Sequence, residues 1–177
     1  MRLVLFLLFF PLQGLANDWD ALQTQGAVAI MRHALAPGTG DPANFDVTDC
    51  NTQRNLDARG QAQARAIGAA LTTRGFTFGA VFTSAWCRCR ETAELMDVGP
   101  VLVEPSLNSF FRNRTAESAQ TAATTKIVGQ SSGPTLMVTH HVNITALTGV
   151  FPASGEIIVI RATDTGVEVL GQILIEP

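Results

Sequence analysis

The sequence predicts an α/β fold with a mainly parallel sheet. Short apolar runs alternate along the chain with segments whose apolar residues recur at helical spacing. The length of 177 residues suits one domain with a sizeable core. Hydrophobic residues make up 46% of the chain and charged residues only 15%, which is typical of a compact protein without a long disordered tail. Alternation of strand and helix in such a chain favours a layered sandwich.

The N-terminal segment has the features of a secretory signal peptide. Arg2 supplies a short positive region, residues 3–10 are apolar, and a small-residue cleavage site ends at Ala16. A membrane anchor is the weaker interpretation, because the apolar run is well short of the ~20 residues that span a bilayer. We therefore expect a cleaved signal of residues 1–16, one domain of residues 17–177, and a periplasmic or secreted protein without a stable membrane anchor.

The first predicted elements after the signal are a helical lead-in, a strand, a loop and a helix. The lead-in covers residues 18–25, and the continuous apolar run of residues 27–31 is typical of a buried parallel strand. Residues 34–52 are rich in Pro, Gly, Asp and Asn and predict a long loop. Alanines at helical spacing predict a helix that begins after Asp57, a suitable N-cap, and ends at Gly75.

The middle of the chain continues the alternation. Residues 80–83 form a second short apolar run and predict a strand. A helix through residues 90–95 ends before Gly99, and residues 100–104 predict a third strand. Residues 115–128 are rich in alanine and threonine and predict a helix.

The C-terminal part of the chain adds three strands and a short helix. The apolar run of residues 135–139 predicts a fourth strand. Residues 142–147 predict a short helix that Gly149 closes. Residues 156–162 and 167–175 predict two strands joined by a turn.

Composition excludes some partners and constrains the cysteines. The formal net charge is −3, so neither a nucleic-acid footprint nor a polybasic membrane patch is indicated. In an exported protein the three cysteines favour a disulfide, and one of them stays unpaired or pairs between chains. Cys87 and Cys89 lack the spacing of a redox motif. Two interpretations stay open: a bridge from Cys50 to Cys87 or Cys89, and three buried free thiols.

Chemically active side chains follow three of the predicted strands. Arg32 and His33 come directly after the first apolar run, and Arg88 follows the second. His140 and His141 come after the strand over residues 135–139. Because ligands bind outside the carboxyl ends of parallel strands, we expect these side chains to meet at one edge of the sheet.

Arginines beside histidines form a receptor for a phosphate dianion. Guanidinium groups match phosphate oxygens, and a histidine can attack phosphorus or carry a proton. Phosphoryl transfer depends mostly on positioning and charge stabilisation, which such a set supplies without a metal or another cofactor. The sequence therefore predicts a phosphoryl-transfer site.

Four motifs together resemble the histidine phosphatase superfamily, in particular its phosphoglycerate-mutase-like branch and the small exported phosphatases within it. They are Met-Arg-His at 31–33, Leu-Asp-Ala-Arg-Gly-Gln-Ala-Gln-Ala at 56–64, Thr-Ser-Ala-Trp-Cys-Arg-Cys-Arg-Glu-Thr-Ala-Glu at 83–94, and Val-Thr-His at 138–140. Each is weak alone, but their order and spacing cover nearly the whole mature chain. The resemblance implies a three-layer α/β/α sandwich around a mostly parallel mixed sheet, with one strand running against the others.

The resemblance also implies a covalent mechanism. His33 is expected to attack phosphorus and to carry a phosphohistidine, while Arg32, Arg88 and His140 hold the phosphoryl oxygens. Water then releases phosphate. Arg54 is a candidate for extending the anion pocket from the loop, and no metal or other cofactor is expected.

The chain departs from the family pattern at three places, and one of them is His141, which follows His140 where glycine is common. The usual Arg-His-Gly reads Arg-His-Ala, with Ala34 in the third position. The glutamate that many members carry in the loop after the third strand has no counterpart in residues 107–111. Glu156, at the start of the expected antiparallel strand, is the leading substitute as proton donor. The rival carboxylates are Asp46, Asp49 and Glu104.

These observations predict an exported, metal-independent phosphomonoesterase that acts through a phosphohistidine. A catalytically weak module that binds a phosphorylated ligand is the alternative from another functional class, and a phosphomutase is the enzymatic alternative. The expected partner is a small-molecule phosphate ester or a phosphorylated glycan or protein. The sequence selects neither among these substrates nor an oligomeric state.

Overall fold

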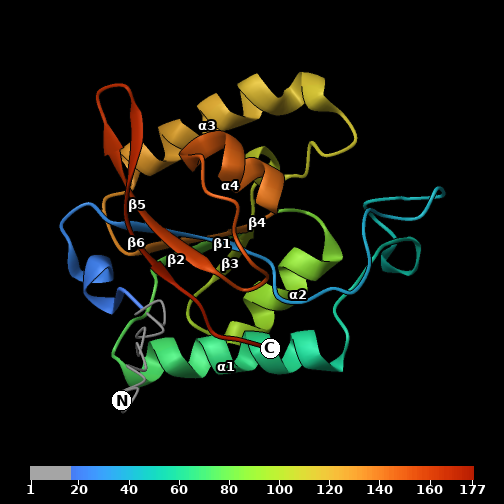
Figure 1. The fold of residues 1–177 in the computed structure, drawn as a ribbon, viewed down its shortest axis with the longest axis horizontal. Helices are drawn as coiled ribbons and strands as arrows, with labels where there is room; N and C mark the ends of the chain where they lie inside the picture. The colour runs from blue at the N-terminus through green and yellow to red at the C-terminus, as the bar shows by residue number, and fades with distance from the viewer. Residues whose placement is uncertain (1–16) are drawn as a thin grey trace, which may run out of the picture.

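A six-stranded sheet is the middle layer of the computed structural model, which describes residues 17–177 (Figure 1). The signal peptide predicted over residues 1–16 lies outside the described residues. The strand order is β3-β2-β4-β1-β5-β6. The strands are β1 (Val28–Arg32), β2 (Ala80–Thr83), β3 (Val101–Val103), β4 (Thr135–Thr139), β5 (Ile157–Thr163) and β6 (Gly166–Ile173).

Strand directions make the sheet mixed but mostly parallel. β4 pairs in parallel with β1 on one side and with β2 on the other, and β2 pairs in parallel with β3. β5 is antiparallel to both of its neighbours, β1 and β6. Of the six described strands, β5 alone therefore runs against the rest, which confirms the predicted sheet.

Helices cover both faces of the sheet, as the prediction of an α/β/α sandwich requires (Figure 1). Helices α1 (Ala58–Thr73) and α2 (Cys87–Met96) lie on one face, and α3 (Glu117–Gln130) and α4 (His141–Thr148) on the other. Successive side chains of a strand point to opposite faces, so β1 contributes to two cores. Ala29 and Met31 pack with the α1 and α2 side, whereas Val28 and Ile30 pack with α3 and α4.

The start of α1 fixes the chain just after β1. The side chain of Asp57 caps the helix by accepting from the backbone N–H of Gly60, 2.9 Å away. A Cβ at Gly60 would lie 1.9 Å from the carbonyl oxygen of Leu35, so only glycine allows this approach. The buried Gln63 then accepts a hydrogen bond from the backbone N–H of Leu35 at 2.9 Å. Two residues of the sequence motif thus hold the backbone that follows His33.

Four short 3-10 helices occur where the sequence analysis expected helix or loop. They are η1 (Trp19–Gln23), η2 (Cys50–Thr52), η3 (Pro105–Leu107) and η4 (Arg114–Ala116). The predicted lead-in over residues 18–25 is therefore a 3-10 helix. The helix predicted over residues 115–128 begins later, at Glu117, because the chain first makes the η4 turn, which Asn113 caps.

The loop between β1 and α1 is tied to α2 by a disulfide. Cys50 pairs with Cys87, with 5.7 Å between their Cα atoms and 37 positions between them in the sequence. This confirms the first of the two interpretations of the cysteines. Cys89 is buried and unpaired within the described residues, and burial raises the pKa of its thiol to about 12.

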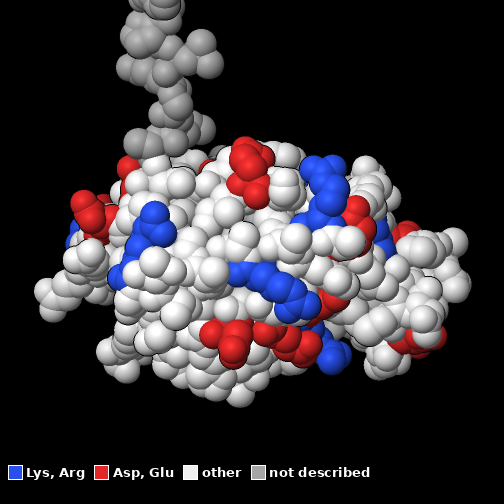
Figure 2. Space-filling view, turned by 90° about the horizontal axis from the view of Figure 1, so that it is seen from below, with Lys and Arg blue, Asp and Glu red and all other residues white. Residues whose placement is uncertain are grey.

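The surface on the side of α1 carries mixed charges. Figure 2 shows positive and negative side chains interspersed on this face, without a broad patch of one sign. None of the helices within residues 17–177 is long and apolar enough to cross a membrane.

Candidate active site

Three parallel strands deliver their next residues to one place. The backbone N–H of His33 donates to the carbonyl of Thr139 at 2.9 Å, and that of Ser84 to the carbonyl of Val138 at 3.0 Å. The carboxyl ends of strands β1, β2 and β4 are therefore aligned at one edge of the sheet, as predicted. A cavity of about 310 Å³ opens at this edge, lined by Arg32, His33, Gly38, Thr39, Gly40, Asp41, Phe45, Arg54, Trp86, Arg88, Ser109, Phe111, Arg112, His140, His141 and Phe151.

His33 is held in one tautomer by its neighbours. Its Nδ1 lies 2.7 Å from the backbone carbonyl of Ala34, which only accepts hydrogen bonds, so Nδ1 carries the proton. Its Nε2 accepts from the Nε–H of Arg88 at 3.2 Å. Nε2 is thus unprotonated, as a nucleophile requires, and its lone pair is held by Arg88 until a ligand displaces that hydrogen bond.

His140 takes the opposite tautomer. Its Nδ1 faces the Nη2 group of Arg88 at 3.4 Å, and because arginine only donates, this nitrogen is the acceptor. Its Nε2 then donates to the hydroxyl of Ser84 at 2.9 Å. The rings of His33 and His140 meet edge to face, with centroids 5.5 Å apart. Arg88 therefore lies against both histidines.

Burial and charge keep both histidines neutral. Burial is the main cause that lowers the pKa of His33, and the positive charge of Arg88 lowers it further. The pKa of His140 is lowered by the same two causes in the same order. The lone pair of His33 therefore stays free well below the pH at which an exposed histidine becomes protonated.

The lining residues are strongly cationic. Four of them are arginines, at positions 32, 54, 88 and 112, and one is an aspartate. Burial, followed by the charge of Arg88, lowers the pKa of Arg54 to about 10, which still leaves that side chain charged near neutral pH. The Nε of Arg32 is buried without a hydrogen-bond partner among the described residues. The cavity is therefore built for an anion.

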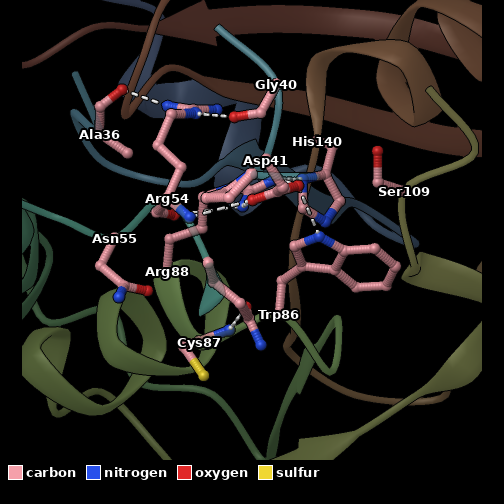
Figure 3. Close-up of polar contacts among 12 residues, drawn as sticks. Ala36, Gly40, Asp41, Arg54, Asn55, Trp86, Cys87, Arg88, Ser109 and His140 are labelled. Carbon is pink, nitrogen blue, oxygen red and sulfur yellow. Dashed lines mark hydrogen bonds and ion pairs between the residues drawn. The ribbon is translucent and has the colours of Figure 1, made fainter. Parts of the chain in front are cut away.

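Asp41 is the residue that sequence reasoning missed. Its carboxylate lies against the guanidinium of Arg88, at 2.7 Å from Nη1 and 3.3 Å from Nη2 (Figure 3). It also accepts from the indole N–H of Trp86 at 3.1 Å and from the backbone N–H of Arg54 at 3.1 Å. Burial alone raises the pKa of this carboxyl, but the hydrogen bonds and charge of Arg88 outweigh burial and hold the pKa below its usual value.

Arg54 supports the same loop as Asp41. Its guanidinium donates to the carbonyl of Gly40 at 3.0 Å and to that of Ala36 (Figure 3). Arg54 lines the cavity, as the sequence analysis expected. The structure therefore brings together five of the six predicted site residues, namely Arg32, His33, Arg54, Arg88 and His140.

Glu156 is the sixth, and its side chain does not line the cavity. Its backbone is close to the site, because its carbonyl accepts from the N–H of Arg32 at 3.1 Å. Its carboxylate is buried and accepts from the backbone N–H of Ala153 at 2.7 Å. The start of the strand was predicted correctly, but the carboxylate accepts a hydrogen bond from the turn that precedes the strand and does not face the cavity. Its role as proton donor stays a prediction.

Aromatic side chains complete the lining. Phe45, Phe111 and Phe151 come from three different loops, and Trp86 precedes α2. Loop residues of this kind carry no periodic pattern, so tertiary contacts decide which of them reach the cavity. The Gly-Asp-Pro sequence at residues 40–42, in the loop that follows Arg32 and His33, is the local signal by which Asp41 could have been found. Within residues 17–177, no three His, Cys, Asp or Glu side chains are grouped so as to hold a metal ion.

Comparison with known proteins gives a family match. The model of the histidine phosphatase superfamily (branch 1) matches residues 28–110. This range contains His33, Asp41, Arg54 and Arg88, whereas His140 lies beyond it and is brought to the site by the pairing of β4 with β1. No curated protein sequence matches the chain significantly.

Solved structures share the fold at low sequence identity. SixA from Agrobacterium tumefaciens is 18% identical, with a TM-score of 0.59 over 84% of this chain and 97% of that one. The protein histidine phosphatase SixA complexed with tungstate is 20% identical, with a TM-score of 0.56 over 83% and 96%. Phosphoglycerate mutase from Thermus thermophilus is 17% identical, with a TM-score of 0.58 over 85% and 99%.

Proposed function

We propose that this chain belongs to the histidine phosphatase superfamily (branch 1), whose model matches residues 28–110, and that it hydrolyses phosphate monoesters through a phosphohistidine on His33. The observation that carries the proposal is the unprotonated Nε2 of a neutral histidine beside Arg88, in a cavity lined by four arginines. A nucleophile and a receptor for a dianion are then in one place.

In the first step, Nε2 of His33 attacks phosphorus. The new N–P bond forms as the P–O bond to the leaving group breaks, and the bonding electrons go to the leaving oxygen. The carbonyl of Ala34 stabilises the positive charge that develops on the imidazole, because it accepts the Nδ1 proton at 2.7 Å.

The charge on the transferring phosphoryl group is balanced by the arginines. Arg88 lies beside the attacking nitrogen, and the partnerless Nε of Arg32 supplies a further donor. Preorganised cations of this kind stabilise the charge that develops in the transition state. In the second step, water attacks phosphorus, the N–P bond breaks, and its electron pair returns to Nε2 of His33. The proton that the water loses passes through solvent to the leaving-group oxygen freed in the first step, and phosphate leaves.

Export is part of the proposal. Disulfides are typical of proteins in oxidising compartments, so the bridge between Cys50 and Cys87 supports export. We propose that residues 1–16 are removed as a signal peptide and that the mature protein acts in the periplasm or outside the cell. Mass spectrometry of the protein recovered from its native host tests this, with Asn17 as the expected first residue.

The central experiment traps the covalent intermediate. The reaction with phenyl phosphate that carries a labelled phosphoryl group is stopped by rapid quench. It is expected to give a phosphoenzyme that is stable in base and labile in acid. Peptide mass spectrometry is expected to map the label to His33. His33→Ala is expected to lose the label while keeping its thermal unfolding transition. Label on a serine or cysteine would contradict the proposed mechanism.

Further measurements separate the proposal from a module that only binds phosphorylated ligands and from a metal-dependent enzyme. Binding of phenyl phosphate without turnover or label would indicate a module that only binds phosphorylated ligands. Turnover is expected to survive dialysis against a strong chelator, and a loss that zinc or magnesium restores would indicate a metal enzyme. Tungstate, with which one SixA structure is complexed, is a tetrahedral oxyanion and is the probe for competitive inhibition.

A further inference from the structure

Large aromatic side chains are exposed to solvent at the mouth of the cavity. Phe111 is 48% exposed and Phe151 is 70% exposed. Both lie against the imidazole of His141, with ring centroids 6.0 Å and 4.9 Å from it. The three rings come from the loop after η3, the first turn of α4 and the segment before β5. We call Phe111, His141 and Phe151 the aromatic rim.

A second pair of rings lines the same cavity. Phe45 stacks on Trp86 with centroids 5.1 Å apart and planes inclined by 23°. Trp86 in turn meets the ring of His140 edge to face at 5.4 Å. Its indole N–H is fixed on Asp41, so this ring is held at a set orientation (Figure 3). The part of a substrate that extends beyond the phosphoryl group therefore meets mainly rings.

The cavity also lacks a carboxyl group suited to donate a proton. Asp41 is the one carboxylate among the described lining residues, and all its close contacts are donors that favour its ionised form. Arg88 keeps the pKa of this carboxyl below its usual value although burial opposes that. A leaving group that departs here receives no proton from the lining carboxylate.

Leaving groups differ greatly in their need for that proton. A phenol has a pKa of about 10, so phenolate departs without full protonation. An alkoxide is nearly as basic as hydroxide, whose conjugate acid has a pKa of about 15.7. Positioned general acids contribute typically ~10²- to 10⁴-fold, and alkyl esters depend on that contribution far more than aryl esters.

Both observations lead to the same substrate class. We propose that the natural substrate is a small aryl phosphate, in which the phosphoryl group is carried on a planar aromatic ring that lies among the aromatic rim, Phe45 and Trp86. This inference rests on the proposed phosphatase function. It follows from two independent features: rings that line the cavity mouth, and a lining carboxylate committed to Arg88.

Three matched esters separate the two features. Phenyl phosphate has an aromatic ring and a good leaving group. Benzyl phosphate has an aromatic ring and an alkoxide leaving group. Cyclohexylmethyl phosphate has a saturated ring of similar size and an alkoxide leaving group. The value of kcat for phenyl phosphate is expected to exceed that for benzyl phosphate by about 10²-fold or more. The KM for benzyl phosphate is expected to be about two- to tenfold lower than that for cyclohexylmethyl phosphate.

Variants of the rim test ring recognition directly. Phe151→Leu and Phe111→Leu keep an apolar side chain but remove the ring, so they are expected to raise KM for benzyl phosphate to that for cyclohexylmethyl phosphate. Phe76→Leu is the matched control, because Phe76 stacks on Trp19 and does not line this cavity. It is expected to leave the ratio of the two KM values unchanged.

The outcomes distinguish this inference from the function on which it rests. Absence of both turnover and phosphoenzyme with all three esters would overturn the proposed function. A phosphoenzyme on His33 together with equal kcat for phenyl and benzyl phosphate, or equal KM for benzyl and cyclohexylmethyl phosphate, would overturn the aryl substrate class alone.

Discussion

Arg88 uses its whole guanidinium before any ligand is bound. Nε donates to His33, Nη2 to His140 at 3.4 Å, and Nη1 to Asp41 and the carbonyl of Arg54. Both members of the ion pair are buried, with side chains 4% and 9% exposed. An incoming phosphoryl oxygen must therefore share the guanidinium of Arg88 with the carboxylate of Asp41, or displace that carboxylate from it. Asp41 and the phosphate group of a ligand therefore compete for the positive charge of Arg88.

Removing that carboxylate charge is expected to strengthen anion binding. In Asp41→Asn the repulsion between carboxylate and phosphate disappears, so inorganic phosphate is expected to bind roughly tenfold more tightly, or by about 1.4 kcal/mol. Competitive inhibition by phosphate measures this. Asp46→Asn, in the same loop but exposed and outside the cavity, is the control. Weaker phosphate binding in Asp41→Asn would show that Asp41 chiefly positions Arg88.

The position of Glu156 predicts a small effect of its substitution on catalysis. Glu156→Gln keeps an oxygen that can accept from Ala153, and the side chain lies outside the cavity lining. The kcat for phenyl and benzyl phosphate is therefore expected to stay within about twofold of the original, well below the effect of losing a general acid. Steady-state kinetics with both esters measures this. A loss of about 10²-fold or more confined to benzyl phosphate would restore Glu156 as the general acid.

The long loop between β1 and α1 is fixed to the element that carries Arg88. Its anchor is the disulfide from Cys50 to Cys87, the first residue of α2. Nearby, the side-chain oxygen of Gln53 accepts from the backbone N–H of Cys87 at 2.9 Å. The same loop supplies Asp41, Phe45 and Arg54 to the cavity. Loop and helix therefore act as one unit in shaping the site.

Loss of the disulfide is expected to cost stability and substrate affinity. In the chain-entropy model, a closed loop of this size contributes about 3 to 4 kcal/mol to the free energy of unfolding. Cys50→Ser/Cys87→Ser is expected to lose that amount in urea denaturation and to raise KM for phenyl phosphate. As control, a reductant should destabilise the original protein and leave the double variant unchanged. Alkylation of all three cysteines in the denatured, unreduced protein would contradict the bridge.

The molecule as a whole is expected to lose stability in mild acid. Burial lowers the pKa of His33, His140 and His141 below the ordinary value of 6.5. Between that value and the lowered ones, the unfolded chain binds more protons than the folded chain, so the free energy of unfolding falls as pH falls. Urea denaturation between pH 7.5 and 5.5 measures the slope. His33→Gln/His140→Gln is expected to flatten it, and an unchanged slope would contradict the cause.

The sheet and the centre of the site were predictable because both depend on local pattern. His33, Arg88 and His140 each follow an apolar run, and parallel strands bring such positions to one edge. Asp41 and Phe151 were missed because their positions depend on tertiary contacts: the disulfide, the bonds of Arg54 and the packing on His141. Glu156 shows the same limit, since the strand start was foreseeable but the partner of the carboxylate was not.

The strand order has a consequence for how the chain acquires its structure during synthesis. β1 is the first strand to be made, yet its two neighbours are β4 and β5, which contain residues 135–139 and 157–163. Until those residues emerge from the ribosome, β1 has no strand partner on either side. Pairing of strands so distant in sequence is slow, and unpaired strands invite aggregation. We therefore expect the sheet to close around β1 only after residue 163 has been made.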